Sequence, residues 1–284
     1  MATLNNYFSL IKFSHTVFAL PFALIGFFLA SSQFGFDWVN LVLVLMCMLF
    51  ARSAAMAFNR YIDRDIDLKN PRTAEVREIP KGVISPKAAL LFVIFTSVNF
   101  IITTYFINTL CFYLSPIALI VVLGYSYTKR FTSLCHLFLG LGLALAPLGA
   151  YLAVSGKFTI SPILFSVAVL FWVSGFDIIY ALQDDTFDKE NKLNSLPVFL
   201  GRNKALNLSK LFHLITLLSL AYAGILLEIN LLYWIGFALF SALLIYQHTI
   251  ISEKDLSRVN LAFFTTNGIA SVVFGVFVIL DFLL

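Results

Sequence analysis

Long apolar windows recur along the whole chain, and they constrain its fold more than any other feature. A helix needs roughly 20 apolar residues to cross the hydrocarbon core of a bilayer, which is about 30 Å thick. Nine such windows are present, at 10–31, 38–60, 88–107, 109–128, 134–154, 161–182, 206–226, 230–250 and 259–282. With 60% hydrophobic and 12% charged residues, the chain lies outside the range of soluble globular domains. We predict an all-α fold, a polytopic membrane bundle of nine transmembrane helices that forms a single intramembrane domain over residues 1–284.

Basic residues collect in alternate connections between these windows, which predicts the orientation of the bundle. They follow the second, fourth, sixth and eighth windows, whereas the lysine on the other side is Lys157. Because Lys and Arg are enriched in cytoplasmic loops, we expect a cytoplasmic N-terminus, and nine crossings place the C-terminus outside. The net charge of +4 reflects this topology. It does not indicate a nucleic-acid-binding surface, and we infer neither a nucleic acid nor an obligate protein partner.

Acidic residues form two regular stripes at the cytoplasmic ends of two windows. Asn59, Asp63 and Asp67 recur every four residues after the second window, and Asp184 and Asp188 do so after the sixth. At about 100° per residue, each set lines one face of a helix. Like charges at this spacing destabilise a helix unless a cation lies between them. The two stripes therefore predict a site for hard divalent cations.

Two charged residues lie deeper on the same faces. About two turns before each stripe, the face reaches Arg52 in one window and Asp177 in the other. Ionisable residues within membrane helices are costly and are functional candidates by default. We therefore count both residues among the candidates for substrate binding. For any single acid in these stripes, a solvated ion pair at a helix end is the alternative interpretation.

The ligand types and the nearby cations indicate what the site would bind. Carboxylates and the amide oxygen of Asn59 suit magnesium, which keeps several waters and commonly bridges protein carboxylates to substrate phosphates. Arg72 follows the first stripe, Lys129 ends the fourth window and Lys12 begins the first. Basic groups mixed with metal-binding carboxylates match a diphosphate. A polyanionic head above an apolar bundle describes a prenyl diphosphate, although each basic residue taken alone is equally consistent with a topology anchor.

The two polar connections that carry the stripes resemble one another, at about 59–87 and 184–205. In each, the acidic residues are followed by proline, then glycine, and then by a helix that starts with Lys-Ala. This weak internal repeat predicts two halves of one bundle, with two metal-binding loops whose mouths face each other.

Three motifs in a fixed order carry a family resemblance. They are Asn59-x3-Asp63-x3-Asp67 with Asn70-Pro71-Arg72-Thr73, Tyr125-x3-Lys129-Arg130, and Tyr180-x3-Asp184-x3-Asp188. In this order the motifs resemble the UbiA superfamily of intramembrane prenyltransferases, over nearly the whole chain. The most similar members are the bacterial 4-hydroxybenzoate polyprenyltransferases of ubiquinone biosynthesis and related enzymes of menaquinone routes.

The resemblance implies an activity, a location and a role for each motif residue. It implies transfer of a polyprenyl group from an allylic prenyl diphosphate to an aromatic acceptor such as 4-hydroxybenzoate or a similar quinone precursor, in a bacterial inner membrane with the site open to the cytoplasm. Two magnesium ions would bridge the diphosphate, one held by Asn59, Asp63 and Asp67, the other by Asp184 and Asp188. The diphosphate would also contact Arg72, Lys129 and Lys12. The acceptor would contact Arg52. The allylic carbon would lie beside Tyr125 and Tyr180.

Departures from the family pattern leave the acceptor open. Arg60 stands where the commoner first motif has Asp, and Lys12 stands where Arg is frequent, near His15, to which we assign no role. Heme, chlorophyll and archaeal lipid prenyltransferases share the metal motifs. A divalent-cation transporter is the alternative from another class, because acids in a bundle also mark ion pathways. A non-catalytic lipid-binding scaffold is a third, and it leaves the paired acidic stripes without a purpose.

Overall fold

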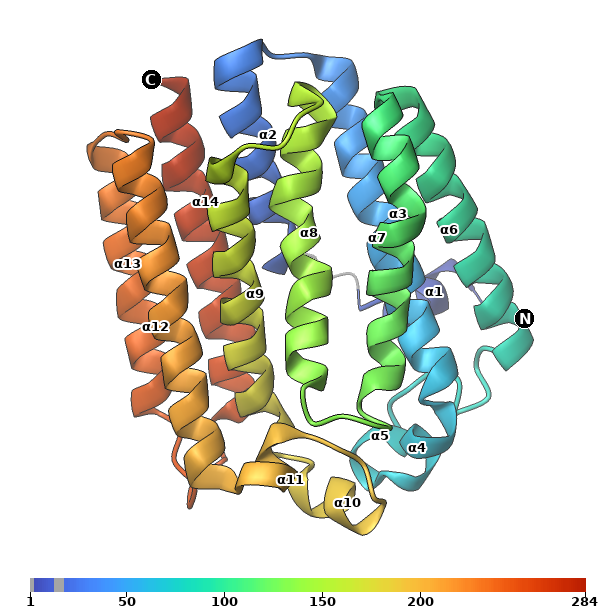
Figure 1. Cartoon of the computed structure of the whole chain (residues 1–284). Coiled ribbons are helices and arrows are strands. Elements are labelled where there is room, and N and C mark those ends of the chain that lie inside the picture. The colour runs from blue at the N-terminus through green and yellow to red at the C-terminus, as the bar shows by residue number, and fades with distance from the viewer. Residues whose placement is uncertain (1–2, 13–17) are drawn as a thin grey trace.

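The computed structural model of the chain describes residues 3–12 and 18–284, and within these ranges all regular structure is helical (Figure 1). The helices are α1 (Leu4–Leu10), α2 (Leu20–Phe34), α3 (Trp38–Ile62), α4 (Arg64–Lys69), α5 (Pro71–Ala74), α6 (Pro86–Ile107), α7 (Thr109–Thr128), α8 (Cys135–Ser155), α9 (Ile160–Ala181), α10 (Asp185–Glu190), α11 (Leu196–Leu200), α12 (Arg202–Leu226), α13 (Leu231–Thr249), the π-helix η2 (Leu261–Thr266) and α14 (Asn267–Leu283).

Eight stretches of helix in the described residues are long and apolar enough to cross a bilayer, and they agree closely with eight of the nine predicted windows. These are α3, α6, α7, α8, α9, α12, α13, and η2 joined to α14. The predicted start of the first window, at residue 10, is wrong. Leu10 ends α1, and the apolar helix α2 begins at Leu20 with Pro21 in its first turn, a position that suits proline, and has only 15 residues. A count of nine crossings and the orientation of the termini stay predictions, and His15 lies outside the described residues.

Short polar residues set the ends of several long helices. Asp37 accepts hydrogen bonds from the backbone N–H groups of the first turn of α3, and Asn108 does the same for α7. Ser85 caps α6, where Pro86 occupies the first helical position. These caps satisfy N–H groups that a helix end leaves without partners. Asn108 also donates from Nδ2 to the carbonyl of Leu152, at 2.9 Å, so that the cap ties α7 to the end of α8.

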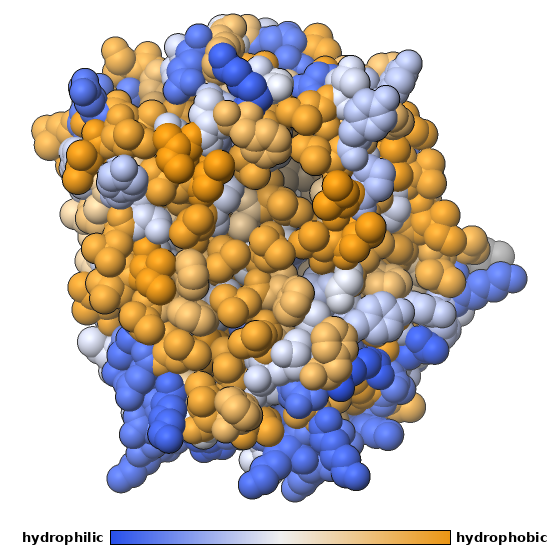
Figure 2. Space-filling model, viewed as in Figure 1, coloured by the Kyte–Doolittle hydropathy of each residue, from blue (hydrophilic) through white to orange (hydrophobic). Residues whose placement is uncertain are grey.

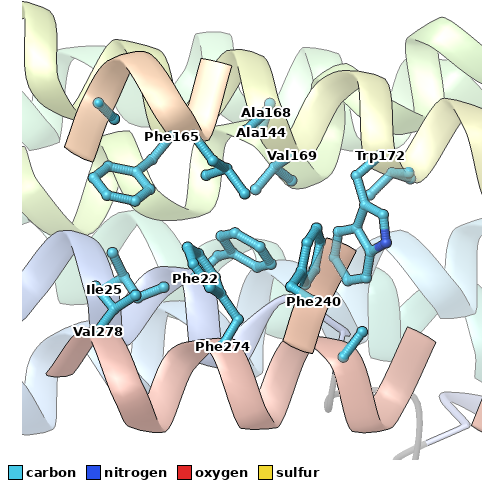
Figure 3. Close-up of a cluster of buried hydrophobic side chains, with 14 of the residues drawn as sticks. Phe22, Ile25, Ala144, Phe165, Ala168, Val169, Trp172, Phe240, Phe274 and Val278 are labelled. Carbon is cyan, nitrogen blue, oxygen red and sulfur yellow. The ribbon is translucent and has the colours of Figure 1, made fainter. Parts of the chain in front are cut away.

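The main core lies between α2, α8, α9, α12, α13 and α14, and it is rich in aromatic rings (Figure 3). Phe22 packs against Trp172 with ring centroids 5.2 Å apart, and Phe240 packs against Phe274 at 5.3 Å. Tilted and edge-on pairs of this kind add about 0.5–1.5 kcal/mol each beyond their buried area. Many of the phenylalanines in this chain therefore hold the helices together instead of facing lipid.

Other apolar side chains cover the outside of the bundle. Trp38 and Ile120 each expose 71% of their surface, and Figure 2 shows a continuous apolar face between polar ends. A soluble monomer rarely exposes apolar surface of this extent. The exposed belt matches a protein surrounded by lipid, as the length and hydropathy of the helices also indicate.

The connections that carry the two acidic stripes lie at the same end of the bundle. Figure 1 places α4 and α5 beside α10 and α11, at the end opposite the C-terminus. The two connections thus lie close together, and the division of the bundle into two repeated halves stays a prediction.

Close helix crossings generate a prediction on stability. At Gly26 of α2, an added Cβ would lie 2.0 Å from the carbonyl oxygen of Pro147 in α8, whereas at Gly149 nothing lies within 4 Å. Alanine favours a helix over glycine by about 1 kcal/mol, but overpacking costs about 1–3 kcal/mol. We expect Gly26→Ala to lower the thermal unfolding midpoint in detergent, and Gly149→Ala to leave it unchanged or higher. Equal midpoints for the two variants would contradict this close approach of α2 to α8.

Candidate active site

The first acidic stripe spans a break between two helices. The prediction of one continuous helical face is wrong here, because α3 ends at Ile62 and Asp63 joins it to α4. Aspartate is a poor residue for a helix interior and a good one for an end. The backbone spacing nevertheless persists, since Asp63 N–H donates to Asn59 O at 2.9 Å and Asp67 N–H donates to Asp63 O at 2.7 Å. The three side chains therefore stay on one side, and Asn59 Nδ2 donates to Asp63 Oδ2 at 3.0 Å.

The second stripe is broken in the same way. Helix α9 ends at Ala181, and Asp184 precedes the short helix α10, which carries Asp188. The N–H of Asp188 donates to the carbonyl of Asp184 at 2.7 Å, so these two residues also share one side. In both cases a long membrane helix ends shortly before an aspartate, Asp63 or Asp184, and a short helix begins directly after that aspartate.

Arg72 joins the two stripes. Its Nε donates to Asp184 Oδ1 at 2.9 Å, its Nη2 donates to Asp184 Oδ2, and its Nη1 donates to the hydroxyl of Tyr180 at 2.8 Å. Asn70 Nδ2 also donates to Asp184, at 3.1 Å. Planar guanidinium groups bind carboxylates in this two-pronged way, which fixes direction as well as distance. The loop after the first stripe is thus bonded to the first aspartate of the second.

Lys129 joins the halves a second time. Its ammonium lies 3.3 Å from Asp63 Oδ2, while its backbone carbonyl accepts a hydrogen bond from the N–H of Asn194 at 2.8 Å. Asn194 belongs to the loop that follows α10. Arg77 pairs with Asp67 in turn. Three of the four stripe aspartates are therefore held by cations, and two of those cations come from other segments of the chain.

The donor set fits a divalent cation once those cations are displaced. Within the described residues, no three Asp, Glu, His or Cys side chains form a ready-made metal group. However, Asp63 is 2% exposed and its Oδ1 has no hydrogen-bond partner, with Arg130 at 3.7 Å. A buried carboxylate oxygen without a partner is costly. Carboxylate oxygens in this state are ligands of the kind that magnesium takes.

The pKa values of two stripe aspartates are raised, which also indicates that their carboxylates lack sufficient positive partners. Burial raises the pKa of Asp63, although the nearby Lys129 opposes the shift. Burial also raises the pKa of Asp188 to about 6, with the charge of Asp184 adding to the effect and Lys129 opposing it. Both directions mean that the charged forms lack full compensation, which is what a bound cation would supply.

One of the two deeper candidates, Arg52, lines an apolar cavity of about 340 Å³ between α3, α6, α7 and α8, and Asp177 does not. Tyr125 also lines this cavity, and the remaining lining is almost entirely apolar. Arg52 Nη2 donates to the carbonyl of Lys12 at 2.8 Å. The structure therefore places the backbone of Lys12 beside Arg52, and its side chain is half-buried. Figure 2 shows the apolar face hollowed near its middle.

The two tyrosines have different surroundings. Tyr180 stacks on Phe263, with ring centroids 4.1 Å apart, and the guanidinium of Arg72 lies 5.1 Å from its ring. Phe263 belongs to η2, a π-helical stretch of the kind that often marks functional sites. Asn267 supports that stretch, because its Nδ2 donates to the carbonyls of Ala262 and Phe263. Tyr125 and Tyr180 thus lie on separate elements, and their predicted place beside an allylic carbon stays a prediction.

Several functional contacts were missed by reasoning from the sequence. Asp177 accepts a hydrogen bond from His136, with Nδ1 and Oδ2 2.7 Å apart, and His136 lies at the start of α8. Arg60, the departure from the family motif, donates from Nη1 to the amide oxygen of Asn59 at 3.1 Å. A histidine at the end of an apolar window is the one sequence signal for the first contact. No sequence pattern indicates the second.

Comparison with known proteins settles the family. A model of the UbiA prenyltransferase family matches residues 19–269, which is most of the chain. The chain belongs to the UbiA prenyltransferase family. This confirms the resemblance that the three motifs carry, and it identifies the protein as a membrane-embedded prenyltransferase.

Individual members agree in sequence and in fold. The 4-hydroxybenzoate octaprenyltransferase of Nitrosomonas europaea is 32% identical over 241 residues, covering 84% of this chain and 81% of that protein. The enzyme of the same name from Thiobacillus denitrificans is 31% identical over 248 residues, covering 87% and 84%.

Two solved UbiA homologs share the architecture. The apo structure of a UbiA homolog from Aeropyrum pernix K1 has a TM-score of 0.85 at 30% identity, covering 94% of this chain and 98% of that chain. A UbiA homolog from Archaeoglobus fulgidus bound to GPP and Mg²⁺ has a TM-score of 0.75 at 24% identity, covering 98% and 100%, and this likeness shows the fold.

The raised pKa of Asp188 predicts a pH-dependent gain in stability on its neutralisation. A carboxyl group whose folded pKa exceeds its ordinary value contributes stability at low pH, and this contribution is lost as the pH rises through about 6. We expect Asp188→Asn to raise the unfolding midpoint at pH 7.5 in the presence of a chelator, and to raise it less at pH 5. A gain that grows as the pH falls would contradict the sign of this shift.

Proposed function

We propose that this protein catalyses Mg²⁺-dependent transfer of a polyprenyl group from an allylic prenyl diphosphate to an aromatic acceptor of the 4-hydroxybenzoate type, a quinone precursor. The observation that carries the proposal is the meeting of two acidic stripes, from separate halves, at the end of a bundle that also holds an apolar cavity. A diphosphate with a long apolar chain has the two parts that such a site accommodates. The curated relatives named above favour the same acceptor class.

The roles follow from charge and position. Asn59, Asp63 and Asp67 would hold one magnesium ion, and Asp184 and Asp188 another. Bound magnesium would supply positive charge that stabilises the leaving diphosphate.

Basic side chains complete the diphosphate site. Once metal ions occupy the carboxylates, Arg72 and Lys129 would turn their donors to the diphosphate, with Lys12 as a further contact. Preorganised donors of this kind stabilise the negative charge that develops as the C–O bond breaks.

The deeper residues would handle the carbon skeleton. The apolar cavity between α3, α7 and α8 would take the beginning of the prenyl chain. Tyr125 and Tyr180 would present ring faces to the developing allylic cation. Arg52 would pair with a carboxylate of the acceptor, and Asp177 would face the acceptor from α9. We place this site at the cytoplasmic side of a bacterial inner membrane.

A cation transporter is less well supported. Among the described residues that line the cavity, Arg52 is the one charged side chain. A path for divalent cations would need anionic or carbonyl ligands along its length. Uptake of labelled magnesium or manganese by proteoliposomes would favour the transporter and contradict the enzyme.

The acidic stripes predict a loss of turnover. We expect Asp63→Ala and Asp184→Ala each to reduce prenyl transfer by about 10²–10³-fold or more, because each removes charge that must hold the metal–diphosphate assembly. The measurement is product formation from magnesium, an allylic diphosphate and a panel of phenolic acids, followed by mass analysis of the lipid extract. Asp65→Ala is the matched control, because the Asp65 side chain is 61% exposed and contacts Arg130. Normal product formation by either stripe variant would refute the assignment.

Arg52 predicts a separate effect on the acceptor. We expect Arg52→Ala to raise the acceptor KM by roughly 10- to 100-fold, the equivalent of a lost hydrogen bond to a charged group, with prenyl diphosphate binding little changed. Cys47→Ala is the control, since it alters the same cavity without removing a charge. If prenyl diphosphate binding collapses instead, Arg52 belongs with the phosphate ligands.

A further inference from the structure

We propose that Asp177 is the general base that takes the ring proton from the acceptor after prenyl transfer, and that His136 is its positioning residue. The inference rests on the proposed function and adds to it the last chemical step. An aromatic carbon that has bonded to the prenyl group still carries its hydrogen, and aromaticity returns only when that proton leaves.

His136 lies in a contact that fixes its tautomer. It is 2% exposed, its Nδ1 lies 2.7 Å from Asp177 Oδ2, and its Nε2 accepts a hydrogen bond from the backbone N–H of Leu196 at 3.3 Å. A nitrogen that accepts from an N–H cannot carry a proton itself. The proton of the neutral ring must therefore be on Nδ1, which donates to Asp177. A neutral donor orients the carboxylate and leaves its charge in place.

Asp177 differs from the stripe aspartates in its partner. Asp63, Asp67 and Asp184 are bonded to Lys129, Arg77 and Arg72. In the described part of the chain, His136 is the hydrogen-bond partner of Asp177, through Oδ2, so that Oδ1 remains available. A carboxylate paired with a cation is a weaker base than one that accepts from a neutral ring. Asp188 is the remaining stripe residue, and we have assigned it to metal.

The position of Asp177 suits an acceptor below the metal site. From Trp172 to Ile179, every residue of α9 is buried except Asp177, whose side chain is 21% exposed. Within α9 it lies three residues before Tyr180, on the same helix face. Because α9 is packed among other helices, this partial exposure indicates an internal opening near the mouth.

Asp177 lies nearer the mouth than Arg52. Asp177 is four residues before the end of α9 at Ala181, and Arg52 is ten residues before the end of α3 at Ile62; the difference is about 9 Å of helix. His136 shares its face of α8 with Leu139 and Leu143, which line the cavity beside Arg52. An acceptor held by Arg52 through its carboxylate would thus have the Asp177–His136 pair on the side of the second half.

The step is balanced without an added reactant. The C–H bond of the prenylated ring carbon breaks, its electron pair restores the aromatic ring, and the proton bonds to Asp177 Oδ1. The proton then passes to water at the mouth, which regenerates the carboxylate. Diphosphate has already left with the electron pair of the C–O bond.

The test separates proton removal from binding. Asp177→Asn keeps an oxygen that accepts from His136 Nδ1–H but removes the basic charge. We expect its kcat to fall by about 10²-fold or more, the usual share of a general base. For Asp177→Asn we also expect a lower kcat with an acceptor deuterated at the reacting ring carbon than with the unlabelled acceptor. The wild type should give equal kcat values for the two acceptors. The acceptor KM should change little.

Matched variants locate the effect. Asp281→Asn removes a buried carboxylate near the opposite end of the bundle, where Asp281 accepts from the N–H groups of Asn230 and Tyr233, and it should show no isotope effect. His136→Gln retains a donor and an acceptor and should keep most of the rate, whereas His136→Leu should acquire the same isotope effect as Asp177→Asn.

Two results would overturn the inference. An unchanged kcat in Asp177→Asn, or a lower kcat without an isotope effect, would assign Asp177 to binding or packing. Failure of the wild type to form any prenylated phenol would instead overturn the proposed function itself. The two failures are therefore distinguishable in one experiment.

Discussion

The pairing of carboxylates with cations across the two halves is the interaction on which the site depends. A charge at the end of a membrane bundle is costly unless it has a partner. Arg72 reaches Asp184 from the first loop, and Lys129 reaches Asp63 from the end of α7. The Arg72–Asp184 pair joins the two acidic stripes directly. Lys129 joins them through two groups, because its ammonium pairs with Asp63 while its backbone carbonyl accepts from the N–H of Asn194, in the loop after α10.

This arrangement explains how one cluster would serve both metal and diphosphate. In the structure the cations occupy the carboxylates, and no three-ligand metal group exists within the described residues. A divalent ion would replace the cations as the partner of the carboxylates. The displaced Arg72 and Lys129 would then need an anion, which the diphosphate provides. Binding of metal and of substrate would thus support each other, because neither leaves an uncompensated charge behind.

The sequence predicts the local parts of this picture and misses the long-range ones. Hydropathy locates eight spanning stretches because each helix satisfies its own backbone in lipid. The i, i+4 spacing identifies Asp63 and Asp184 because it is a property of one segment. The breaks at those residues and the late start of α2 follow from local preferences of aspartate and proline that a count of periodicity does not include. The 2.7 Å contact of His136 with Asp177 joins two different helices, and periodicity carries no information about it.

The loop after α10 has a further consequence for the chemistry. Its Asn194 N–H donates to the carbonyl of Lys129, and the N–H of Leu196, where α11 begins, donates to His136. The loop is therefore bonded at both points beside the site, and these contacts set Lys129 and His136 in place. An allylic cation reacts with water as well as with an aromatic ring, and excluding water prevents that side reaction. The backbone contacts that complete the site are thus also those that would limit hydrolysis.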